Sequence, residues 1–154
     1  MAAPIVTWTE PDNDLSVVSK WSMGKIKAGT AAPERTILVW NNKGGTTAVS
    51  AMQDVQITTT DGAGDTLDAV ADKWVKVRCI SDGIDEAVAS EIGGATTHTI
   101  TAYNQQPGVI SGQVNDGLVS NRENFAKLVL SCLPPLDVPA GLRSLKTRII
   151  YYYA

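Results

Sequence analysis

The sequence has few of the residues from which most enzyme sites are built. Its 154 residues include one histidine, two cysteines and one phenylalanine, and only 19% are charged. Nucleophilic and acid–base catalysis need a nucleophile, a base and a group that orients the base. The single histidine, His98, has no such partners near it along the chain, so we expect a surface or strand-edge histidine and no enzymatic activity.

Concentrated positive charge and long apolar runs are also missing. Thirteen Lys and Arg stand against sixteen Asp and Glu, which gives a net charge of −3 and a pI near 5.0. A nucleic-acid binder needs a basic surface that displaces counterions from phosphate. No run approaches the roughly 20 apolar residues of a membrane span. We therefore expect neither nucleic acid nor a membrane as a partner.

The amino-terminal residues Met1–Trp8 lack the basic and apolar regions of a signal peptide, so we expect synthesis in the cytoplasm without export. Hydrophobic residues make up 44% of the chain, which argues against disorder. The length fits one domain over residues 1–154.

Strand patterns alternate with turn patterns along the whole chain. Apolar alternation or β-branched runs predict strands at 21–27, 35–41, 52–60, 73–80, 126–133 and 143–153. Helical patterns are confined to 65–73, 82–92 and 120–125, where Ser120 and Glu123 have the spacing of a capping box. Short strands separated by Gly, Pro and Asn turns predict an all-β, immunoglobulin-like antiparallel sandwich of about seven to nine strands.

Cofactor and metal sites find little support. Cys79, Cys132 and His98 lack the local spacing of a zinc site. Acidic clusters supply oxygen ligands but do not continue into an EF-hand loop, so we expect solvated turns at 12–14, 61–65 and 82–86. We predict no cofactor and no bound metal.

The two cysteines each follow apolar residues at a spacing of two. This pattern predicts small buried core residues at Cys79 and Cys132. The alternative is a disulfide between the two sheets, a device known in immunoglobulin-type sandwiches.

Aromatic residues are few, and most lie in predicted strands or near the carboxyl end. We expect Trp40 in the core and Trp74 against the stems of Lys76 and Arg78. The run 148–153 is apolar on both faces, which indicates a strand buried within its own domain or one that contacts a neighbouring subunit through Tyr151 or Tyr152.

Two resemblances follow from particular phrases. The stretch Trp21–Gly29, then Thr36–Thr46 and Val55–Ile57, resembles the first strands of immunoglobulin-like sandwiches. More of the chain is similar to small virion-associated structural proteins of tailed bacteriophages, in the phrases W-N-N-K-G-G-T-T-A-V-S-A-M, I-T-T-T-D-G-A-G-D, K-W-V-K-V, I-G-G-A-T-T and G-Q-V-N-D-G. This resemblance carries no catalytic motif.

The phage resemblance implies a non-enzymatic virion subunit, either a capsid decoration protein or a tail or baseplate accessory, attached in many copies to the major capsid protein or to a tail or baseplate protein. A homo-oligomer is an open possibility. The alternative is a module that binds carbohydrate on a host surface through Trp8, Trp74 or Tyr103. Predicted partner contacts lie in the turn-rich segment 103–121 and near both ends of the chain, at Trp8, Tyr103, Asn104, Gln105, Gln106, Val109, Tyr151 and Tyr152.

Overall fold

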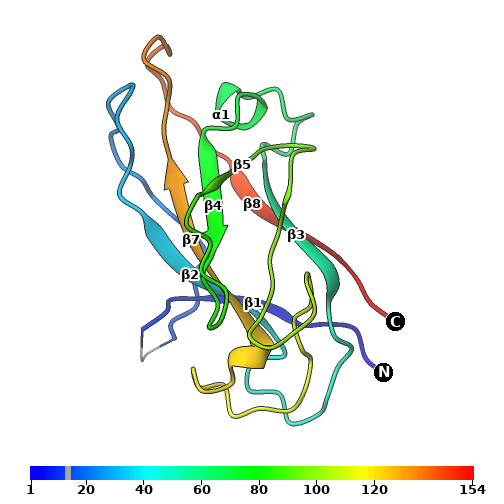
Figure 1. Cartoon of the computed structure of the whole chain (residues 1–154). Helices are drawn as coiled ribbons and strands as arrows, with labels where there is room; N and C mark the ends of the chain where they lie inside the picture. The colour runs from blue at the N-terminus through cyan, green and yellow to red at the C-terminus, as the bar shows by residue number, and fades with distance from the viewer. Residues whose placement is uncertain (13–14) are drawn as a thin grey trace.

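The computed structural model describes residues 1–12 and 15–154 and shows an all-β chain with two antiparallel sheets (Figure 1). The larger sheet has the strand order β1-β2-β7-β4-β5, and the smaller has the order β6-β3-β8. The described strands are β1 (Val6–Thr9), β2 (Arg35–Asn41), β3 (Gln53–Thr60), β4 (Val75–Cys79), β5 (Ser90–Ile92), β6 (His98–Thr99), β7 (Phe125–Cys132) and β8 (Lys146–Tyr152). Helical structure is limited to α1 (Asp68–Ala71) and the 3₁₀ turn η1 (Arg122–Asn124).

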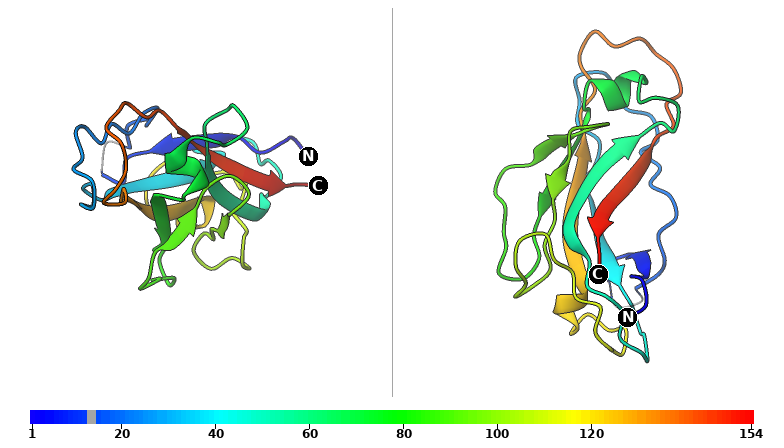
Figure 2. Two further views of the ribbon diagram at one scale, coloured as in Figure 1. Left: turned by 90° about the horizontal axis from the view of Figure 1, so that it is seen from above. Right: turned by 90° about the vertical axis from the view of Figure 1, so that its right-hand side faces the viewer.

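The two sheets pack face to face over one core. Strand residues point alternately to opposite faces, so every second side chain enters this core. The larger sheet contributes Val39, Val77 and Leu128, and the smaller contributes Val55 and Ile57, all essentially without solvent exposure. Figure 2 shows the two layers edge-on.

Strand β2 is covered on both faces, as its continuous apolar run predicts. Ile37 and Val39 face the main core, whereas the alternate residues Leu38 and Trp40 form a second cluster with Leu15 and Phe125. The rings of Trp40 and Phe125 lie 4.6 Å apart, and the indole N–H donates to Thr9 Oγ1 at 2.9 Å. The prediction that Trp40 lies in the core is confirmed.

One predicted strand is wrong. Residues 21–27 form no strand, although Trp21, Met23 and Ile26 are half-buried and pack against the main core. The alternating pattern therefore predicts correctly which side chains face inward. A strand also needs a neighbour to pair with, and the described hydrogen bonds of 21–27 include no ladder.

The helical predictions are correct only in part. The four-residue helix α1 falls inside 65–73, but 82–92 contains no helix and ends in β5. The turn η1 falls inside 120–125, yet its first flanking residue is Asn121 and no side chain caps it. The capping box at Ser120 is therefore wrong. No helix in 1–12 or 15–154 is long and apolar enough to cross a membrane.

Both cysteines are buried free thiols, as predicted for core residues. They lie in one sheet: Cys79 of β4 is opposite Leu128, and Cys132 of β7 is opposite Val75. Four strand positions separate the two pairings, about 13 Å at the usual rise of a strand. Bridged cysteines need Cα atoms within about 7 Å, so the disulfide between sheets is wrong.

Candidate functional site

The connection between β6 and η1 builds one end of the molecule, at the bottom of Figure 1. Residues 100–121 contain no regular helix or strand, and most of the predicted partner contacts lie among them. Structureless loops of this length are uncommon in compact domains and often carry function. The hydrogen bonds that hold this one in place are therefore informative.

Asn42 is the first anchor of this loop. It follows β2 with a φ of 60°, a left-handed conformation that asparagine tolerates better than most residues. Its buried side-chain amide donates to the carbonyls of Thr47 at 2.9 Å and Gly112 at 3.0 Å. In return, the side chain of Asn115 donates to the Asn42 carbonyl at 2.7 Å. These bonds fasten the loop to the turn after β2.

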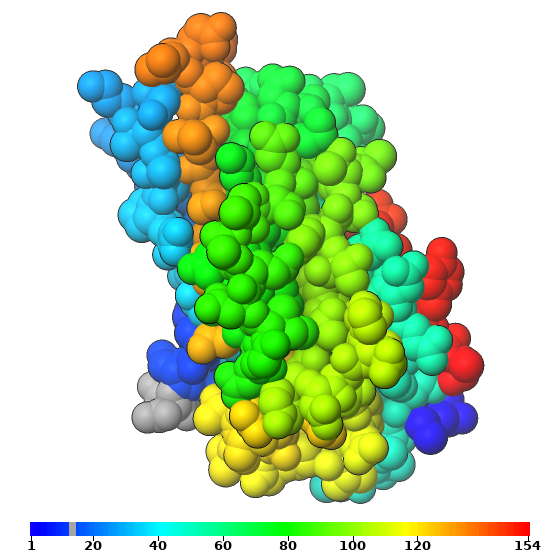
Figure 3. Space-filling model, viewed as in Figure 1, coloured from blue at the N-terminus to red at the C-terminus, as the bar shows by residue number. Residues whose placement is uncertain are grey.

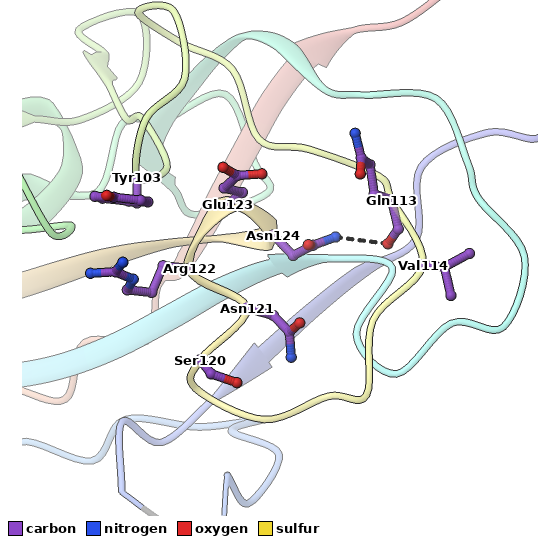
Figure 4. Close-up of a pocket in the computed structure, with 8 residues that line it drawn as sticks. All are labelled: Tyr103, Gln113, Val114, Ser120, Asn121, Arg122, Glu123 and Asn124. Atoms are coloured by element: carbon purple, nitrogen blue, oxygen red, sulfur yellow. Dashed lines mark hydrogen bonds between the residues drawn. The ribbon is translucent and has the colours of Figure 1, made fainter.

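Asn124 is the second anchor and lies in η1. Its amide nitrogen donates to three carbonyls: Gln113 at 3.0 Å, Ser111 at 3.1 Å and Asn41 at 3.3 Å. Figure 4 shows the bond to Gln113. Asn124 is only 4% exposed, so the buried carbonyls of Asn41 and Ser111 would lose this donor without it, whereas the Gln113 carbonyl also accepts a bond from Asn115 at 3.0 Å. The hydrogen bonds of the Asn124 amide thus hold the loop in place, where no strand pairing does so.

A shallow depression opens beside these anchors (Figure 4). The guanidinium of Arg122 stacks over the ring of Tyr103, with its central carbon 3.9 Å from the ring centroid. Arg122 also donates to Asp82 at 2.9 Å, and this hydrogen bond raises the pKa of the guanidinium. Tyr103 and Arg122 are thereby held in one orientation by the neighbouring loop.

Apart from Val114, polar residues form the rest of the depression, among them Gln113, Ser120 and Glu123. Its volume of about 270 Å³ falls below the usual range for small-molecule sites. An open, polar surface of this kind suits contact with another macromolecular surface better than enclosure of a substrate.

The predicted contacts at this end differ in exposure. Asn104 and Gln106 are exposed, whereas Tyr103, Gln105 and Val109 are half-buried. Asn104 has a φ of 55°, which places it at the tip of a tight turn. These five residues share one end of the fold, as the sequence predicts for a contiguous segment.

The remaining predicted contacts lie on strands and outside the loop 100–121. Trp8 is half-buried in β1 and packs against the core, and Tyr151 of β8 also faces the core. Tyr152 points outward and is 67% exposed. Trp8, Tyr151 and Tyr152 therefore do not line the depression beside Tyr103.

Trp74 is placed differently from its prediction. It is 6% exposed, and the guanidinium of Arg143 lies 5.0 Å from its ring centroid. Lys76 and Arg78 are not the cations recorded over this ring. Trp74 is therefore a core residue covered by an arginine from a distant segment.

His98 has a partner that sequence spacing does not reveal. Its Nε2 lies 2.9 Å from both carboxylate oxygens of Glu86, and Glu86 also accepts a bond from the Cys79 backbone N–H at 2.6 Å. The pair links β6 to the connection after β4. Within 1–12 and 15–154, no group of three or more His, Cys, Asp and Glu side chains is arranged to hold a metal ion.

The residues and their geometry are what indicate a function for this chain. The asparagine-anchored loop is the most specific feature of the structure, and short sequence phrases provide the resemblance described above. No family model, no curated protein and no solved structure matches the chain.

Proposed function

We propose that the two sheets form an immunoglobulin-like sandwich. The order β1-β2-β7-β4 matches the order of strands A, B, E and D in that fold, and β3 pairs with β8 as strand C pairs with strand F. Strand β8 is the last strand of the chain, so the position of strand G beside it has no counterpart among the described strands. The connectivity supports the assignment despite this difference.

We further propose that the chain is a non-enzymatic structural subunit of a tailed-phage virion, a capsid decoration protein or a tail or baseplate accessory. The observation that carries this proposal is the loop-built end, ordered by buried amides of Asn42 and Asn124. A loop already fixed before binding loses little entropy when a partner docks. It therefore offers a repeatable contact surface on the capsid or tail protein.

Attachment in many copies strengthens this role. When the copies are joined in one oligomer, each additional contact with the particle acts at high effective concentration, so a modest patch per copy is enough for lasting attachment. The exposed side chains Asn104 and Gln106, next to the Tyr103–Arg122 stack, supply adaptable hydrogen bonds around an aromatic anchor.

A carbohydrate-binding module is the alternative. Sugar recognition of this kind would require exposed aromatic faces, but Trp74 is buried and Trp8 packs on the core. Only Tyr103 of the three predicted rings lies in the depression, and Arg122 covers one of its faces. These contacts favour the virion proposal.

The experiment is to recover phage particles from cells that encode the protein, band them by density, and measure copies per particle by quantitative mass spectrometry. We expect a constant, high copy number in the particle band. Replacing Gln105 and Gln106 with Glu should lower the occupancy, whereas Leu142→Ser, at a residue 98% exposed at the opposite end, should leave it unchanged. Absence of the wild-type protein from the particles would overturn the proposal.

A further inference from the structure

Charge is divided unevenly along this chain. Segments 15–33 and 138–154 together hold six Lys and Arg and no Asp or Glu. The rest of the sequence holds the other seven Lys and Arg and all sixteen Asp and Glu, a balance of −9. The small overall charge of −3 therefore conceals two regions of opposite sign.

The two positive segments lie on the same side of the molecule. Trp21, Met23 and Ile26 from the first pack on the same core as Ile149 and Tyr151 from the second. Segment 17–27 runs on the β8 side in the right-hand view of Figure 2. We name this surface the basic flank and define it by its five exposed cations, Lys20, Lys25, Lys27, Lys146 and Arg148.

None of these five cations forms an ion pair within 1–12 or 15–154. The sixth, Arg143, is different because its guanidinium bonds both oxygens of Asp68, at 2.7 and 2.9 Å. The basic flank thus carries positive charge that the chain itself does not neutralise.

Strand β8 gives the basic flank an apolar centre. Its outward side chains include Ile150, 36% exposed, and Tyr152, 67% exposed. Among the described strands β8 pairs with β3 alone, so its outer edge keeps unpaired N–H and C=O groups. Apolar residues within a charged rim are typical of a protein–protein contact.

The complementary surface is the acidic hairpin, which we define as residues 82–91 between β4 and the end of β5. It carries four carboxylates and no Lys or Arg. The side chain of Asp85 is 89% exposed, and its nearest cation, Arg78, is 3.8 Å away. Glu91 is also exposed, and Val88 between them is 78% exposed.

The acidic hairpin faces away from segment 17–27. It forms part of the front face in Figure 3, and it lies at the opposite side from that segment in the right-hand view of Figure 2. Residues 80–85 also line a shallow hollow whose rim includes Asp82 and Asp85. A long cationic side chain entering this hollow would meet the exposed carboxylate of Asp85, beside the Asp82 carboxylate that already accepts a bond from Arg122.

We propose that the basic flank of one molecule binds the acidic hairpin of a second copy of this chain. Each surface pairs a charged rim with an exposed apolar residue, and the signs are opposite. Two basic flanks, or two acidic hairpins, would repel each other, so a two-fold dimer through either surface is disfavoured. The contact is head-to-tail, which produces rings or open arrays.

This inference concerns the purified protein and stands apart from the virion proposal, because attachment to a particle does not require it. The test is sedimentation velocity from micromolar to millimolar protein, in about 50 mM and about 500 mM salt. We expect reversible self-association at low salt and at least about a tenfold weaker association at high salt, since screening acts on exposed charges.

Charge reversal identifies the two surfaces. The first variant carries Lys25→Glu, Lys27→Glu and Arg148→Glu, and the second carries Asp85→Lys and Glu91→Lys. Each alone should remain monomeric, because neither joins a basic flank to an acidic hairpin: the flank of the first variant has a net charge of −1, and the hairpin of the second has a net charge of zero. An equimolar mixture should associate again, because acidic surfaces then meet basic ones.

Circular dichroism and thermal unfolding check that both variants fold. If one does not, the neutral versions with Gln and Asn replace it and should weaken association without abolishing folding. A wild-type protein that stays monomeric throughout would overturn the proposal. So would single variants that still associate, association that salt strengthens, or a mixture that fails to associate.

Discussion

The two ends of this molecule are both built from loops, but they are held together by different forces. The lower end, residues 41–50 and 102–124, is fixed by buried asparagine amides that donate to backbone carbonyls. The upper end, residues 27–34, 61–74 and 133–145, is fixed by backbone bonds and by carboxylates: Asp61 accepts bonds from the N–H groups of its own loop, and Asp68 pairs with Arg143. Figure 1 shows the two ends at opposite poles of the sheets.

This difference predicts different responses to mutation and pH. A buried amide has no charge to lose and no water to compete for its carbonyls. The Arg143–Asp68 pair is partly exposed and depends on an ionised carboxylate. The lower end should therefore be the more robust, and the upper end should open first.

The largest expected effect is that of Asn124→Ala at the lower end. The substitution leaves the carbonyls of Asn41, Ser111 and Gln113 without this donor in a buried site. We expect the free energy of unfolding to fall by about 2 kcal/mol, since unsatisfied buried groups cost about 1–3 kcal/mol. Denaturant unfolding of the purified protein measures this change.

Asn121→Ala is the matched control for that prediction. Asn121 is half-buried and its amide bonds Leu118 and Asp116 near the surface. Water can replace such bonds, so the loss should be within about 0.5 kcal/mol. Equal losses for the two asparagines would show that burial of the amide is not what orders the loop.

A smaller, local effect is expected from Arg143→Gln at the upper end. The change removes both bonds to Asp68 and the cation over Trp74. Hydrogen exchange should quicken at Gly29 and Ala32, whose N–H groups bond Pro134 and Cys132 next to this segment. Arg148→Gln, at an exposed cation of β8, should leave those rates unchanged.

The smallest effect is that of mild acid. Arg143 holds the pKa of Asp68 below its ordinary value of 3.8, and the backbone N–H groups of Leu67 and Ala63 do the same for Asp61. A carboxylate with a lowered folded-state pKa stabilises folding above its unfolded pKa and loses that contribution as pH falls through the folded value.

Between neutral pH and about pH 4, the protection factors at the upper end, which compare exchange with the intrinsic rate at each pH, should therefore be constant. Below that pH the amides of Leu67 and Ala63 should lose protection. Asp116, whose pKa is also lowered, should release its turn at the lower end. The amide of Gly45, which bonds the Asn42 carbonyl, should stay protected. Loss of protection at Gly45 together with Leu67 and Ala63 would contradict the comparison.

The sequence predicts the central strands well, because a buried strand needs apolar residues at regular positions along the chain. Runs 35–41, 52–60 and 126–133 coincide with β2, β3 and β7 within a residue. Segment 21–27 shows the limit of such a prediction. Its apolar side chains pack against the core as the pattern predicts, but the segment pairs with no strand. The short strands β1 and β5 contain too few residues to show a period.

The candidate site was only half predictable. The turn-rich segment pointed to Tyr103 and Asn104, and their common location follows from their proximity along the chain. The anchors Asn42 and Asn124 are 82 residues apart, and the pairing of Glu86 with His98 also depends on how the strands are arranged. Asparagine is common in turns, so its presence alone does not separate a surface turn from a buried anchor.

The placement of Cys79 and Cys132 has a consequence for how the protein responds to the redox state of its surroundings. Both thiols point into the same core from one sheet, too far apart in register to join, and burial raises the pKa of Cys132. A protonated, buried thiol reacts slowly with oxidants. The fold should therefore have the same stability in reducing and oxidising surroundings, with no covalent maturation step.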